Sequence, residues 1–230
     1  MPEQFKSLEQ YTNKMNKFLP DVPFFCIHLI RASEREPFMT HFQNGLGRLV
    51  EVWPASEGAE VAARGWPRGH PHERETSIGA LGCLDSHIRL LRLMLEKGWE
   101  MMGVFEDDAE LVTSCEKLQD FYMQASSKMP EWDILILGAN EWVDVKKDMN
   151  LAKLTRYWGT HAFLIRRKAA EAVIKVFEDL QAKGYSYPAD WLYSYTISQK
   201  RLLAVGPEVC RSLIRQKPGL ISAINGKVRA

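Results

Sequence analysis

Residues 103–111, with the sequence GVFEDDAEL, place three consecutive acids directly after a short apolar run. Adjacent carboxylates repel one another, and burying them without a counter-charge is costly. The three acids therefore either face water in a turn or are held together by a cation. The apolar run that precedes them is typical of a buried strand, so the acids stand at the carboxyl end of that strand.

Short apolar runs of this kind alternate with helical patterns along the chain. Strands are predicted at residues 23–30, 48–55, 100–107, 132–138 and 201–207, with one or two more within 153–167. Helices are predicted at residues 3–19, 33–47, 76–97, 114–129 and 168–184, with a shorter one within 185–195. This alternation predicts an α/β fold with a mainly parallel sheet and helices on both faces. Ligands of such sheets bind beyond the carboxyl ends of the strands, where Glu106, Asp107 and Asp108 lie.

Three parts of the chain differ in composition. Residues 1–22 are predicted to form an N-terminal amphipathic helix, 23–207 the α/β domain and 208–230 a basic tail. Within the domain, residues 54–75 are rich in glycine, proline and charge, and they are predicted to form a loop. A loop of this length is usually functional or disordered.

Overall composition narrows the classes of partner. Hydrophobic residues make up 46% of the chain, and 30 Lys and Arg against 29 Asp and Glu leave a net charge of +1. We therefore expect no general attraction to nucleic acid. The sequence contains no run long enough to cross a membrane. Four scattered cysteines without a C-x-x-C pair predict reduced thiols in a cytoplasmic protein.

The acidic triplet suits a hard cation. Mg²⁺ and Mn²⁺ are bound by one or two carboxylates, with substrate phosphate and water at the remaining positions. The alternative is a solvated turn in which Asp108 or Ser114 helps to start the next helix.

Several segments, read in order, resemble glycosyltransferase family 25, whose lipooligosaccharide and collagen-type sugar transferases have a GT-A fold. The segments are IHLIRASERE, GALGCLDSHIRLL, GVFEDDAEL, WDILILG, WGTHAFLIRRKAAEAV and YPADW, and they span roughly residues 23–200. The second segment is similar to the family pattern G-E-I-G-C-x-x-S-H. The chain departs from the family at Ala80, where glutamate is usual, and at His28, where asparagine is expected.

The resemblance implies a Rossmann-like three-layer sandwich and a specific reaction. A hexose, galactose or glucose, would pass from a UDP-sugar to a hydroxyl of a glycan, lipid-linked or protein acceptor, with inversion. Mn²⁺ or Mg²⁺ would neutralise the leaving diphosphate. Glu106 and Asp108 would lie on either side of the metal and diphosphate, and Glu106 would also be a catalytic residue. Asp107 would contact the ribose or the donor sugar.

Further residues are candidates, each with a structural alternative. Arg31 and Arg35 follow the first predicted strand. They either bind phosphate of the donor or are solvated charges at the start of a helix. Ser86 and His87 either contact the donor or are satisfied within their helix. His161 is a metal ligand or a strand histidine at the sheet edge. Asp190 is the general base or a helix cap.

Two other functions remain open. One is a Mg²⁺-dependent phosphoryl or nucleotidyl transferase, although no G-x-x-x-x-G-K-[ST] phosphate loop appears in the sequence. The other is a degenerate, non-catalytic domain that binds a nucleotide sugar.

Overall fold

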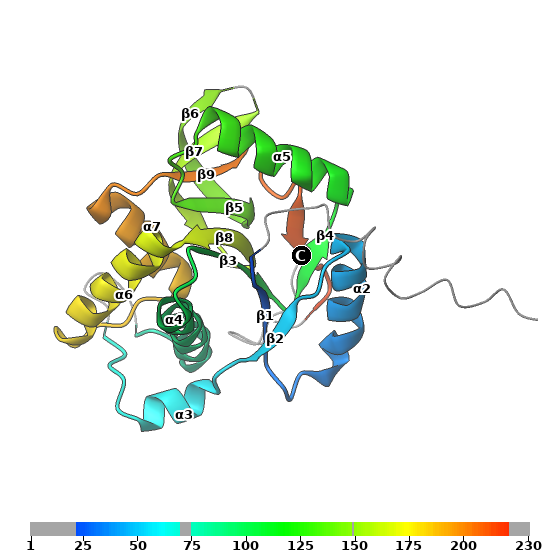
Figure 1. Cartoon of the computed structure of the whole chain (residues 1–230). Coiled ribbons are helices and arrows are strands. Elements are labelled where there is room, and N and C mark those ends of the chain that lie inside the picture. Colours follow the sequence, from blue (N-terminus) through cyan, green and yellow to red (C-terminus); the bar gives the residue numbers. More distant parts are fainter. Residues whose placement is uncertain (1–21, 70–74, 149, 221–230) are drawn as a thin grey trace, which may run out of the picture.

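A computed structural model describes residues 22–69, 75–148 and 150–220 (Figure 1). The helix predicted at residues 3–19 lies outside the described residues. The strands are β1 (Phe24–His28), β2 (Glu51–Pro54), β3 (Met101–Glu106), β4 (Ala109–Leu111), β5 (Ile134–Gly138), β6 (Glu141–Asp148), β7 (Leu151–Trp158), β8 (Ala162–Arg166), β9 (Ala204–Pro207) and β10 (Ile214–Gln216). The helices are the short 3₁₀ helix η1 (Ser33–Arg35), α2 (Glu36–Leu46), α3 (Gly58–Ala63), α4 (Ile78–Lys97), α5 (Cys115–Lys128), α6 (Arg167–Gln181) and α7 (Ala189–Lys200).

Within the described residues, eight strands form one sheet in the order β2-β1-β3-β8-β5-β9-β7-β6. The pairs β1–β2, β1–β3 and β5–β9 are parallel, and β8 and β7 are antiparallel to each of their neighbours. All strands of this sheet except β7 and β8 therefore point the same way. The predicted α/β class with a mainly parallel central sheet is confirmed.

Helices cover both faces of the sheet, as the alternation of side chains along β1 requires. Phe25 and Ile27 pack with α4, α6 and α7, whereas Phe24 and Cys26 pack with α2 and α5. Figure 1 shows α4, α6 and α7 grouped on one side of the strands and α2 and α5 on the other. Because every residue of β1 and β5 is buried, these strands read in the sequence as continuous apolar runs.

Helix ends follow local rules that the sequence shows. The Ser77 side chain accepts a hydrogen bond from the Ala80 backbone N–H and begins α4. Gly98 ends α4 in the left-handed conformation, with φ of 72°. Ser114 caps α5. This position was expected if the acidic triplet is a turn that leads into the next helix.

Three features differ from the prediction. The segment 54–75, predicted to be a loop, contains α3, which packs on α4. A strand, β6, pairs with β7 in an antiparallel hairpin. The tail predicted from residue 208 contributes β10, which pairs with β4 directly after the acidic triplet. These strands were missed because they are only three residues long or, in β6, rich in charge.

No helix in the described parts of the chain combines the length and the low polarity needed to span a membrane.

The buried side chain of Ile214 tests whether the tail belongs to the fold. Ile214 is fully buried with the core around α5, whereas the next residue, Arg215, forms a partly exposed ion pair with Glu110. We expect Ile214→Ala to lower the free energy of unfolding by about 2–5 kcal/mol. Arg215→Ala should lower it by less than about 1 kcal/mol. Equal effects in urea denaturation would show that the segment is a solvated tail.

Candidate functional site

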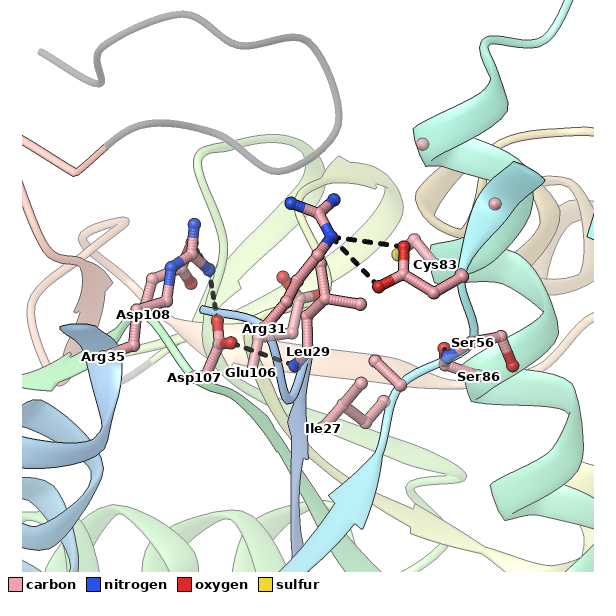
Figure 2. A pocket seen from close by; sticks show the side chains of 14 residues that line it. Ile27, Leu29, Arg31, Arg35, Ser56, Cys83, Ser86, Glu106, Asp107 and Asp108 are labelled. Carbon is pink, nitrogen blue, oxygen red and sulfur yellow. Dashed lines mark hydrogen bonds and ion pairs between the residues drawn. The ribbon is translucent and has the colours of Figure 1, made fainter. Parts of the chain in front are cut away.

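The acidic end of β3 lines a partly open pocket. The wall opposite the acids consists of Ser56, Glu57 and Gly58, where α3 begins, together with Gly79, Cys83 and Ser86 of α4. Arg31 and Arg35, in the segment after β1, complete the lining (Figure 2). The pocket therefore lies at the carboxyl ends of β1 and β3, as expected for this type of sheet.

Asp107 is buried, and both of its carboxylate oxygens have protein partners. Its Oδ2 atom lies 2.9 Å from Nδ1 of His28 and 3.4 Å from the Leu29 backbone N–H, and its Oδ1 atom accepts a hydrogen bond from Arg35. All three charged or polar side chains of this cluster are about 95% buried. Asp107 is thus held by the segment that follows β1. His28 supplies one of these contacts.

Asp108 is also buried, and it lies beside the same guanidinium group. Its Oδ2 atom is 4.0 Å from Nη1 of Arg35, and its backbone carbonyl accepts a hydrogen bond from the Lys217 N–H at 2.7 Å. Burial opposes the charge on Arg35, but the Asp107 and Asp108 carboxylates outweigh it and raise the pKa of Arg35. Arg35 therefore supplies part of the positive charge that the buried acids need.

Glu106 is tied to the opposite side of the site. Its Oε1 atom accepts a hydrogen bond of 2.6 Å from the Thr160 hydroxyl and lies 3.4 Å from Nε2 of His87. Burial alone would raise the pKa of Glu106, but the hydrogen bond and charge of His87, together with Thr160, outweigh burial and lower it. Glu106 is therefore ionised at neutral pH and still lines the pocket.

Gly159 and Thr160 connect Glu106 with Asp190. The Gly159 N–H donates to Oδ2 of Asp190 at 3.1 Å, and the next residue, Thr160, donates to Glu106. Gly159 has φ of 87°, and a Cβ atom there would lie 2.8 Å from Nδ2 of Asn140. A non-glycine residue would be strained in this turn because of the positive φ.

Asp190 is the second residue of α7, not its cap, which is Pro188. Burial is the main reason why the pKa of Asp190 is raised, and the nearby charge of Glu106 adds to the rise. Backbone N–H groups of Gly159 and Trp191 oppose the rise by donating to the carboxylate. A carboxylate with a raised pKa beside another acid has the properties of a proton acceptor.

Ser86 and His87 lie on different faces of α4. The Ser86 hydroxyl donates to the Gly82 carbonyl at 2.6 Å and accepts from the Ser56 N–H at 2.8 Å, so it joins α4 to the segment before α3. A Cβ atom on Gly82 would lie 2.5 Å from the Ser56 carbonyl, which explains the small residue at this contact. His87 is buried and approaches Glu106, and its contact with the donor stays a prediction.

Arg31 and His161 occupy opposite environments. The Arg31 side chain is 65% exposed and makes hydrogen bonds with Glu57 at 3.0 and 3.3 Å across the pocket (Figure 2). The His161 side chain is fully buried, and its backbone carbonyl accepts from the Glu106 N–H. A Cβ atom on Gly138 would lie 2.7 Å from Nε2 of His161, so the imidazole packs against β5. The role of His161 as a metal ligand stays a prediction.

Three residues of the site were not singled out from the sequence as functional: Cys83, Glu57 and Thr160. Cys83 lies one helical turn before His87, and this i, i+4 spacing could have indicated a shared face. Glu57 and Thr160 carry no comparable signal, because each reaches the site through a contact between distant segments. Burial raises the pKa of the Cys83 thiol, and all four cysteines are free.

Comparisons with known proteins agree on one family. The sequence model of glycosyltransferase family 25, described as an LPS biosynthesis protein, matches residues 22–193. A glycosyltransferase 25 family member of Anopheles gambiae is 22% identical over 211 residues, which cover 74% of this chain and 35% of that protein. A member from Drosophila melanogaster is 22% identical over 219 residues, which cover 89% of this chain and 31% of that protein. The chain thus spans about a third of the length of these relatives.

Solved structures show more distant likenesses. A glycosyltransferase involved in the glycosylation of the major capsid of PBCV-1 matches with a TM-score of 0.47 and 11% identity, over 89% of this chain and 95% of that chain. A CMP:2-keto-3-deoxy-manno-octonic acid synthetase complexed with CTP matches with a TM-score of 0.44 and 13% identity, over 82% of this chain and 90% of that chain. Likenesses this weak do not indicate a shared activity.

Arg35 and Arg31 provide a matched test of the buried cluster. Arg35→Met would leave Asp107 and Asp108 buried beside an uncharged side chain, and we expect a loss of about 3–5 kcal/mol in the free energy of unfolding. Arg31→Met removes an exposed pair and should cost less than about 1 kcal/mol. Chemical denaturation of both variants measures the difference. A loss for Arg35→Met no larger than that for Arg31→Met would contradict a structural role for the Arg35–Asp107 pair.

Proposed function

Because the chain belongs to glycosyltransferase family 25, we propose that it transfers a hexose from a UDP-sugar to an acceptor hydroxyl. The donor is UDP-galactose or UDP-glucose, the acceptor is a glycan, lipid-linked or protein hydroxyl, and the anomeric configuration is inverted. The observation that carries the proposal is the pocket that combines Glu106, Asp107 and Asp108 with Arg31 and Arg35. Such a pocket offers both a cation site and guanidinium groups for a diphosphate.

The donor set fits Mg²⁺ or Mn²⁺. Glu106 and Asp108 line the pocket with carboxylate oxygens, which these ions prefer, whereas both oxygens of Asp107 are engaged by His28, Leu29 and Arg35. We therefore propose that Glu106 and Asp108 hold the ion and that Asp107 keeps Arg35 beside Asp108. When bound, the ion would neutralise charge on the leaving diphosphate.

The two arginines have different parts in this proposal. Arg31 is exposed and paired only at the surface with Glu57, so it can exchange this partner for a phosphate at small cost. Arg35 is buried against Asp107, and its charge contributes to the potential of the pocket without leaving that contact. The planar guanidinium of Arg31 can make paired hydrogen bonds with a diphosphate.

Asp190 is the proposed general base. Its raised pKa favours proton acceptance, and the contact between its Oδ2 atom and the Gly159 N–H fixes its orientation. Gly159 and Thr160 link it to Glu106, so the base and the proposed metal ligand are positioned by consecutive residues. His87 approaches the same oxygen of Glu106 and keeps that carboxylate ionised.

Donor binding tests the proposal directly. We expect calorimetric titration to detect binding of UDP-galactose or UDP-glucose that strengthens when Mn²⁺ is present. Glu106→Gln and Asp108→Asn should each weaken metal-dependent binding at least about tenfold, because loss of a charged contact costs about 1.5–3 kcal/mol. Glu110→Gln is the matched control, since Glu110 pairs with Arg215 and Lys217 instead. Binding that ignores the metal, or no binding of any nucleotide sugar, would contradict the proposal.

Asp190→Asn tests the base separately from the donor site. We expect kcat/KM to fall by about 10²–10⁴-fold while donor affinity is retained, since asparagine can still accept from the Gly159 N–H. In the unsubstituted protein, activity requires ionised Asp190. It should therefore be present above the raised pKa and disappear as the pH falls through it. Asp179→Asn, on the exposed face of α6, is the control. An unchanged pH profile in Asp190→Asn would exclude Asp190 as the base.

A further inference from the structure

Three different metal-ligating side chains meet at the inner wall of the pocket. The thiol of Cys83, an imidazole nitrogen of His87 and a carboxylate oxygen of Glu106 all lie within 4.8 Å of one another. We propose that they form a second cation site, selective for a soft divalent metal such as Zn²⁺. This inference goes beyond the sugar transfer proposed above and does not rest on it.

The ligand atoms are nearly in place. Zn²⁺ binds sulfur at about 2.3 Å and nitrogen or oxygen at about 2.0–2.2 Å, so neighbouring tetrahedral ligands lie roughly 3.3–3.7 Å apart. Nε2 of His87 and Oε1 of Glu106 are 3.4 Å apart, which already matches this spacing. Cys83 and His87 occupy consecutive turns of α4 at i and i+4, so both face the same side of the helix.

His87 is oriented as a metal ligand usually is. Its second ring nitrogen, Nδ1, lies 3.4 Å from the Tyr193 hydroxyl, which leaves Nε2 directed at Glu106. The ring also stacks on Phe163, with centroids 5.9 Å apart and an angle of 16° between the planes. Metal-binding histidines commonly have their other nitrogen held by such a partner. Packing and the Tyr193 contact therefore fix the imidazole before any metal binds.

A fourth ligand can reach the site from the pocket. Cys83 and Glu106 both line the pocket, whereas His87 is buried behind them. Three protein ligands with one open position is the arrangement of zinc sites that also bind water or a substrate. The thiol separates this set from the carboxylates of Glu106 and Asp108, because sulfur favours zinc and oxygen alone favours magnesium and manganese. Since Glu106 belongs to both sets, occupation of one site constrains the other.

Cobalt substitution tests the proposed site in the unsubstituted 230-residue chain. Co²⁺ should bind with one equivalent per chain and produce a thiolate-to-cobalt absorption band, which only a cysteine ligand can give. We expect Cys83→Ser to remove the band and to weaken Zn²⁺ binding at least about tenfold. Cys115→Ser and Cys210→Ser are matched controls, because these two cysteines are free and partly exposed like Cys83. Both controls should retain the band.

A measurement on the unsubstituted protein covers the case in which a variant fails to fold. Zn²⁺ should protect Cys83 from alkylation, detected by peptide mass spectrometry, whereas Mg²⁺ at the same concentration should not. The proposal is overturned if the absorption band is absent from the unsubstituted protein or survives in Cys83→Ser. It is equally overturned if zinc leaves the alkylation of Cys83 unchanged.

Discussion

The contact between Asp107 and Arg35 lets an acidic strand end lie inside the protein. Three adjacent carboxylates would repel one another and resist burial, but Asp107 lies against Arg35 and His28, and Arg35 also faces Asp108. This contact joins β3 to the segment after β1 and forms one side of the pocket. All three acids line the pocket, and both oxygens of Asp107 are engaged by protein groups.

A second set of contacts joins the site to the turn before β8 and to α7. Thr160 holds Glu106, and Gly159 holds Asp190, so the turn before β8 positions an acid of β3 and an acid of α7 together. β8 runs antiparallel to β3, which brings the start of β8 to the end of β3. The reversal of one strand thereby places residues more than fifty positions apart in sequence within hydrogen-bond distance. His87 closes the group from α4.

Sequence patterns predicted those strands and helix ends that depend on residues close together in the chain. The buried strands β1, β3 and β5 appear as apolar runs, and α4 is delimited by Ser77 and Gly98. The ordered motifs also indicated glycosyltransferase family 25, which the match to residues 22–193 confirmed. Patterns failed for β10, because three residues carry too little periodicity to identify a strand. Its pairing with β4 depends on a partner about a hundred residues away.

The sequence by itself determined the α/β class, the family and the location of the acidic triplet at a strand end. Each follows from residues close together in the chain, through apolar periodicity, helix caps or ordered motifs. Only the tertiary structure decided the separate environments of Glu106, Asp107 and Asp108. Thr160 and His87 contact Glu106, whereas Arg35 and His28 contact Asp107. All four partners lie outside the strand that carries the acids. Charge and hydrogen bonding act over a few ångströms of space, and the chain reaches those distances only after it folds.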